Sequence, residues 1–125
     1  MSSDSKKNIE KFEDLEVWQE SMRLAVEIYD QLKSCKDFAL RDQMHRAVIS
    51  IPSNIAEGFE RQSNKDYIRF LYISKGSTGE LRTQLYLAIR LEIIGKEAGN
   101  LLIDKTRKIS SMLFNLIRVR AENFS

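Results

Sequence analysis

Apolar residues recur at alternating steps of three and four along most of this chain. The first such stripe comprises Leu15, Trp18, Met22, Ala25, Tyr29 and Leu32. This spacing matches the turn of an α-helix and places one apolar face toward a core. A single Pro and five Gly interrupt the 125 residues, and no alternating strand pattern competes. The sequence therefore predicts an all-α protein.

The same spacing predicts four helices. The first starts at Asp14, as its N-cap, and ends within residues 33–36. The second covers about 37–60, with the stripe Leu40, Met44, Ala47, Val48, Ile51 and Ile55. The third runs from an N-cap at Ser63 to about residue 94. The fourth covers about 97–122, with the stripe Leu102, Thr106, Ile109, Leu113 and Leu116.

Pro52 lies within the second predicted helix, where it removes a backbone donor and crowds the preceding turn. The segment is then either one kinked helix or two shorter helices. The apolar stripe keeps its phase across Pro52, which favours the kinked helix. Gly58 suits the end of this helix because glycine has a permissive backbone.

Four amphipathic helices with short connections predict an up-down-up-down four-helix bundle. We expect the bundle to occupy residues 12–122, preceded by a disordered tail over residues 1–11. At this length a single domain can bury a real hydrophobic core.

The third predicted helix is apolar around most of its circumference, which exceeds the single stripe that a bundle needs. Near its middle lie Gly76 and Gly79, each of which lowers helix stability by about 1 kcal/mol relative to Ala. One interpretation is a central helix wrapped by the other three. The favoured interpretation is an inner stripe for the core and an outer stripe for a subunit interface. We therefore expect a homo-oligomer.

Small and polar residues form a second pattern beside these apolar stripes. Its members are Ser50, Asn54, Glu57, Ser77 and Glu80. If buried, these groups must find hydrogen-bond partners, so we expect a structural polar network. A solvated face and a ligand site remain the alternatives.

Composition restricts the chemistry of the chain. The single Cys35 excludes an intrachain disulfide, and no Cys/His cluster could build a metal site. His45 has no triad partner or nucleophile motif, and no phosphate-binding glycine loop occurs. We expect no cofactor, no small-molecule substrate and no enzymatic activity. The polar N-terminus lacks the apolar region of a signal peptide, which favours a cytoplasmic protein without membrane contact.

Basic residues are the candidate binding groups. The net charge is only +2, so a polyanion site would depend on charge placement. The candidates for contacts with RNA or DNA are Arg46, Arg61, Lys65, Arg69, Arg82 and Arg90. Further basic residues include Lys75 in the third helix, and Lys105, Arg107, Lys108, Arg118 and Arg120 in the fourth. The alternative is a soluble surface of mixed charge.

Three segments carry a family resemblance: FEDLEVWQ at 12–19, RAVISIPSNIAEG at 46–58 and FLYISKGSTGEL at 70–81. With their order and spacing, over about residues 12–116, the chain resembles the 23S rRNA intervening-sequence proteins, also labelled S23 ribosomal proteins. One departure is the turn after Glu57 and Gly58, where bulky Phe59 and acidic Glu60 precede Arg61. Glu60 could dilute the positive potential there.

The resemblance implies a four-helix bundle that assembles into a ring-like or barrel-like homopentamer without catalytic activity. Some members are encoded within intervening sequences of 23S rRNA genes. A related branch serves diversity-generating retroelements as an accessory protein that partners a reverse transcriptase and nucleic acid. The expected ligand is RNA or DNA, and a protein partner such as a reverse transcriptase is the alternative.

Overall fold

A computed structural model describes residues 9–124 and contains, within that range, helices but no strand. The elements are η1 (Phe12–Asp14), α2 (Glu16–Gln31), α3 (Phe38–Phe59), α4 (Asn64–Arg90) and α5 (Lys96–Phe124). The prediction of an all-α protein with four long helices is confirmed. Residues 1–8 of the predicted tail lie outside the described residues. Ile9 and Phe12 pack against the core.

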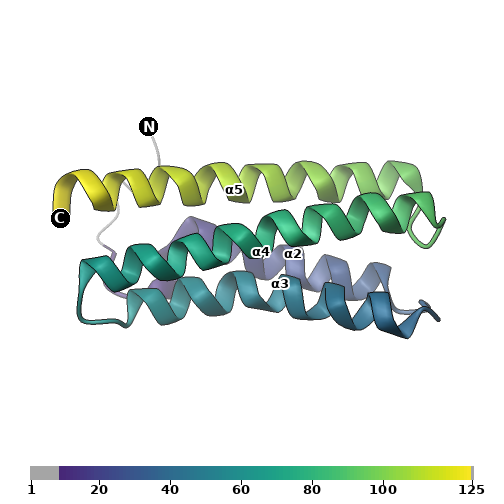
Figure 1. Cartoon of the computed structure of the whole chain (residues 1–125), viewed down its shortest axis with the longest axis horizontal. Coiled ribbons are helices and arrows are strands. Elements are labelled where there is room, and N and C mark those ends of the chain that lie inside the picture. Colours follow the sequence, from purple (N-terminus) through teal and green to yellow (C-terminus); the bar gives the residue numbers. More distant parts are fainter. Residues whose placement is uncertain (1–8, 125) are drawn as a thin grey trace.

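The four long helices lie side by side, and the chain turns back at each connection (Figure 1). Helix α4 packs against α3 and α5, while α2 packs against the other sides of α3 and α5. The core fills the space between them, and its largest fully buried side chains include Leu24, Ile28, Met44, Ile51, Leu71, Leu81, Leu85, Ile103 and Ile109. Within the described residues, no helix is long and apolar enough to cross a membrane.

The predicted stripes of the second and fourth helices are confirmed. Their residues are buried, apart from Leu40 and Leu116, which are half-buried. The stripe predicted for the first helix is confirmed at Leu15 and Leu32, which are buried, and at Trp18 and Ala25, which pack against the core, but it is wrong at Met22 and Tyr29. The buried residues of α2 are Val17, Ser21, Leu24 and Ile28, whereas Met22 and Tyr29 are exposed. Ser21 is tolerated in the core because its hydroxyl donates to the Trp18 carbonyl oxygen at 2.8 Å.

The predicted N-cap at Asp14 is also wrong. Leu15 precedes α2 and makes no side-chain capping bond. Asp14 belongs to η1, where its carboxylate accepts hydrogen bonds from the backbone N–H groups of Glu10 and Lys11 at 3.2 and 3.3 Å. The carboxylate therefore caps the short helix rather than α2.

Helix α3 continues through Pro52, so the single-helix interpretation is confirmed. Side chains donate to the carbonyl groups directly before the proline. Asn54 Nδ2 bonds the Ser50 carbonyl oxygen, and Ser74 Oγ of α4 bonds that of Ile51, both at 2.8 Å. Polar side chains thus reinforce the turn that the proline ring crowds.

Gly58 does not act as a helix C-cap. It is buried inside α3, and no glycine of the described residues has a positive φ. A Cβ at this position would stand 2.7 Å from the Phe70 Cβ and 3.2 Å from the Tyr67 carbonyl oxygen. Gly58 is needed because the backbones of α3 and α4 approach closely here.

Helix α4 ends at Arg90, four residues before the predicted end. Glu92 has a left-handed φ of 59°, and the Ile93 N–H bonds the Ala88 carbonyl oxygen at 2.9 Å. A residue with left-handed φ followed by this hydrogen bond is a common way for a helix to end, and glycine usually occupies the left-handed position. The apolar residues after Arg90 predicted a longer helix. Ile94 is buried in the core, but it lies in the turn that follows α4.

Candidate functional site

Helix α4 has apolar residues on two faces, one turned toward the core and one toward solvent. Its inner face buries Leu71, Leu81, Leu85 and Ala88. Its outer face leaves four large side chains 41–57% exposed: Tyr72, Ile73, Tyr86 and Leu87. A single copy of the chain therefore does not wrap this helix, and the outer stripe needs another explanation.

The predicted polar stripe divides into two parts. The Ser50 and Ser77 hydroxyls share a hydrogen bond of 2.8 Å between α3 and α4, and Asn54 Nδ2 donates to Ser50 Oγ at 2.8 Å. Glu57 is exposed and lies 4.0 Å from the Arg61 guanidinium. Glu80 is exposed on α4. The structure thus joins the serines and the asparagine, and leaves both carboxylates outside their network.

Two predicted basic residues meet on one aromatic ring. The guanidinium carbons of Arg61 and Arg69 lie 4.8 and 4.5 Å from the ring centroid of Phe70. Arg69 also pairs with Asp66 at 3.5 Å. Carboxylates and the ring thus hold this pair at the start of α4, which reduces the charge available to a ligand.

Three other predicted residues are dispersed. Arg46 lies on α3, Lys65 near the start of α4 and Arg90 at its end, and all three are exposed. The structure does not gather them with Arg61 and Arg69 into one patch.

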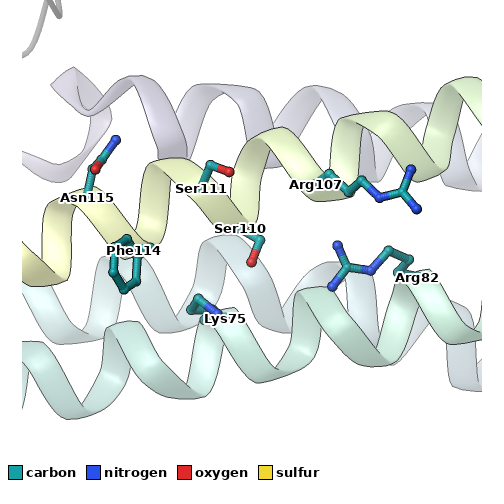
Figure 2. Close-up of a pocket in the computed structure, with 7 residues that line it drawn as sticks. All are labelled: Lys75, Arg82, Arg107, Ser110, Ser111, Phe114 and Asn115. Atoms are coloured by element: carbon teal, nitrogen blue, oxygen red, sulfur yellow. The ribbon is translucent and has the colours of Figure 1, made fainter.

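Arg82 alone among the predicted residues lines a groove. The groove lies between α4 and α5 and has a volume of about 590 Å³. It is lined by Lys75 and Arg82 from α4, and by Arg107, Ser110, Ser111, Phe114 and Asn115 from α5. Figure 2 shows Arg82 pointing from α4 toward α5, while Ser110 and Phe114 point from α5 toward α4.

The groove has an excess of positive charge. Three of its lining residues are cationic and none is a carboxylate. Arg107 contacts Asp104 at 3.3 Å and donates to the Tyr86 hydroxyl at 2.8 Å. Within residues 9–124, Lys75 and Arg82 form no ion pair. Lys75 and Arg82, two cations without an ion-pair partner in one groove, form a candidate anion site.

On the side of α5 that faces α2, two basic residues have acidic partners. Lys105 Nζ lies 2.6 Å from Glu27 Oε2, and Lys108 Nζ lies 3.4 Å from Glu20 Oε1. Both carboxylates come from α2. Thus Lys105 and Lys108 pair with carboxylates of α2, whereas Lys75 and Arg82 have no ion-pair partner within residues 9–124.

His45 lies on α3 against an aromatic ring of α2. Its ring stacks on Tyr29 with centroids 3.8 Å apart, and its Nε2 is buried without a hydrogen-bond partner among the described residues. The described residues also contain no group of three His, Cys, Asp or Glu side chains that could hold a metal ion.

Sequence reasoning missed most of the α5 side of the groove. Ser110, Ser111, Phe114 and Asn115 were not candidates, and Lys75 and Arg107 were noted only as basic residues. A signal was present, because Arg107, Ser111 and Phe114 follow one another at helical steps beside the buried stripe. Pairing that face with Arg82 required knowing the register between α4 and α5.

Comparison with known proteins gives the family. Residues 13–115 match the family model of the 23S rRNA-intervening sequence protein. A similar crystal structure is that of a protein of unknown function from the S23 ribosomal protein family of Bacteroides thetaiotaomicron VPI-5482. It is 31% identical, with a TM-score of 0.76, and the alignment covers 81% of this chain and 97% of that one. No curated protein matches the chain. The chain belongs to the family of 23S rRNA-intervening sequence proteins.

Proposed function

We propose that this chain is a non-enzymatic, cytoplasmic nucleic-acid-binding module that holds RNA or DNA in the basic groove between α4 and α5. The observation that carries the proposal is the pair of cations, Lys75 and Arg82, facing Arg107 across a groove without carboxylates. Phosphate backbones bind such charges by releasing condensed counterions.

We also propose that the chain is an up-down-up-down four-helix bundle that associates into a ring, with a homopentamer as the favoured assembly. The outer face of α4 supports self-association because Tyr72, Ile73 and Leu87 are large, apolar and exposed. Exposed apolar side chains on one helix face often mark an interface. A ring would repeat the groove around its axis and present several basic sites to one polynucleotide.

The experiment compares two double variants of equal charge by fluorescence anisotropy with labelled RNA and DNA oligonucleotides. Lys75→Gln/Arg82→Gln removes two groove cations, whereas Lys105→Gln/Lys108→Gln removes two lysines that pair with carboxylates of α2. We expect only the first variant to weaken binding more than tenfold. It should also lower the slope of log affinity against log salt by about 1.4–1.8, since each phosphate contact contributes about 0.7–0.9.

Equal losses in the two variants would mean that net charge, rather than the groove, controls binding. Absence of binding to RNA and DNA even at low salt would contradict the proposed nucleic-acid-binding function. Light scattering on the same samples tests the ring independently, because a monomer at every concentration contradicts it.

A protein-interaction scaffold is the second candidate, and a separate groove favours it. Between α2 and α5 lies a largely apolar groove of about 600 Å³, with Val26 69% and Leu101 60% exposed on its rim. A partner such as a reverse transcriptase could bury these side chains. If so, Leu101→Glu should abolish co-purification of the partner without changing binding of nucleic acid.

A further inference from the structure

The groove between α4 and α5 has an aromatic end and a cationic end. The Phe114 ring is 55% exposed and points toward α4 (Figure 2). Arg107 lies seven residues earlier on α5, and its bond to the Tyr86 hydroxyl places it beside the later turns of α4. Seven residues of helix correspond to about 10 Å. Phe114 and Lys75 therefore occupy one end of the groove, and Arg82 and Arg107 the other.

Hydroxyl and amide groups also line the groove, beside its aromatic and cationic ends. Ser110 is positioned on α5 between Arg107 and Phe114, and its side chain points toward α4 (Figure 2). Ser111 and Asn115 add a second hydroxyl and a carboxamide to the lining. These groups can donate to and accept from the edge of a base or a ribose hydroxyl. The lining thus combines donors for phosphate, polar partners for sugar or base, and one exposed ring.

Gly79 lies on α4 between two residues of the groove lining, Lys75 and Arg82. It lies four residues after Lys75 and three before Arg82, on the same side of α4. A Cβ at Gly79 would meet nothing within 4 Å, so packing within the chain does not require a glycine. Glycine is among the least favourable residues inside a helix. A larger side chain at position 79 would stand beside Lys75 and Arg82.

We propose that this groove binds an unpaired nucleotide of a single-stranded RNA or DNA. The base stacks on Phe114, and the adjoining phosphate lies between Arg82 and Arg107. This inference rests on the proposed function and adds that the ligand is single-stranded at this site. A duplex hides the faces of its bases, so it cannot use Phe114, whereas each unpaired base exposes a π-face.

The test measures binding of labelled single-stranded RNA, single-stranded DNA and the matching duplex by fluorescence anisotropy. Phe114→Leu keeps an apolar side chain and removes the π-face. It should weaken binding of both single strands by about 5- to 100-fold, the usual effect of one lost stacking platform. Duplex binding should change less than twofold. Phe38→Leu is the matched control, because Phe38 is similarly exposed on α3, far from the groove lining.

A second variant tests the position of Gly79 rather than the ring of Phe114. Gly79→Leu replaces a poor helix former by a good one at a position where a Cβ meets nothing within 4 Å, so it should raise the urea midpoint of unfolding while weakening single-strand binding at least tenfold. Unchanged single-strand affinity in both variants, with a continuing dependence on Lys75 and Arg82, would overturn this inference and leave the proposed function intact. Loss of all nucleic-acid binding in the unmodified chain would overturn both.

Discussion

The position of a Cβ on Gly58 lies 2.7 Å from the Cβ of Phe70, closer than real Cβ atoms approach one another. The obstruction involves the base of the Phe70 side chain and the Tyr67 backbone, so rotation of a flexible group cannot relieve it. Helices α3 and α4 must therefore move apart to accommodate any other residue at position 58.

Gly58→Ala should lower the free energy of unfolding by about 1–3 kcal/mol, the usual cost of overpacking. Gly76→Ala is the matched control, since a Cβ at Gly76 on the exposed side of α4 would meet nothing within 4 Å. That substitution should raise stability by up to about 1 kcal/mol. Urea unfolding at one protein concentration measures both. Equal effects in both variants would contradict the close approach.

Ser74 is fully buried, and its hydroxyl donates to the Ile51 carbonyl oxygen of α3. Ser74→Ala removes one hydrogen bond between α3 and α4 and should cost about 0.5–1.5 kcal/mol of stability. Ser111→Ala, an exposed change on α5, should alter stability by less than about 0.5 kcal/mol. The midpoint of thermal unfolding separates the two. A Ser74 variant as stable as the Ser111 variant would show that water replaces the lost donor.

Asn64 and Arg120 connect the start of α4 to the end of α5 by reciprocal hydrogen bonds. Arg120 Nε donates to Asn64 Oδ1 at 2.8 Å, and Asn64 Nδ2 donates to the Arg120 carbonyl oxygen at 3.0 Å. A double-mutant cycle with Asn64→Ala and Arg120→Ala should give a coupling energy of about 0.5–3 kcal/mol. Additive effects of the two substitutions on urea unfolding would argue against this coupling.

Charge on the outer face of α4 should oppose self-association. Tyr72→Glu places a carboxylate among exposed apolar side chains, and burying it in an interface without a partner would be unfavourable. We expect a smaller species by light scattering at unchanged helicity. Val26→Glu introduces the same charge on exposed apolar surface of α2 and should leave the assembly intact. Dissociation in both variants, or in neither, would place the interface elsewhere.

The helices were predictable because most of their stripes are strongly periodic, as the buried residues of α3 and α5 demonstrate. The exceptions have local causes. Ser21 is a polar residue in the core, so it concealed the buried face of α2. Glu92 adopts a left-handed φ without being glycine, so nothing in its identity announced the end of α4.

The groove was harder to predict than the helices. Helical spacing along one chain segment identifies which residues share a face, but two faces meet only when the register between helices is known. Arg82 was a candidate because it is basic, whereas Ser110 and Phe114 have chemistry that suits many surfaces. Gly58 and Gly76 look alike in sequence, yet only the packing of α3 against Phe70 distinguishes them.

The pairing of Lys105 and Lys108 with α2 has a kinetic consequence. Because those lysines pair with carboxylates and Lys75 and Arg82 do not, the small net charge of +2 is distributed unevenly between the two flanks of α5. An approaching polyanion would experience a torque as well as an attraction, and would arrive already oriented toward one flank. Replacing Glu20 and Glu27 by glutamine would raise the net charge yet misdirect those encounters, so productive association could slow even as overall attraction grows.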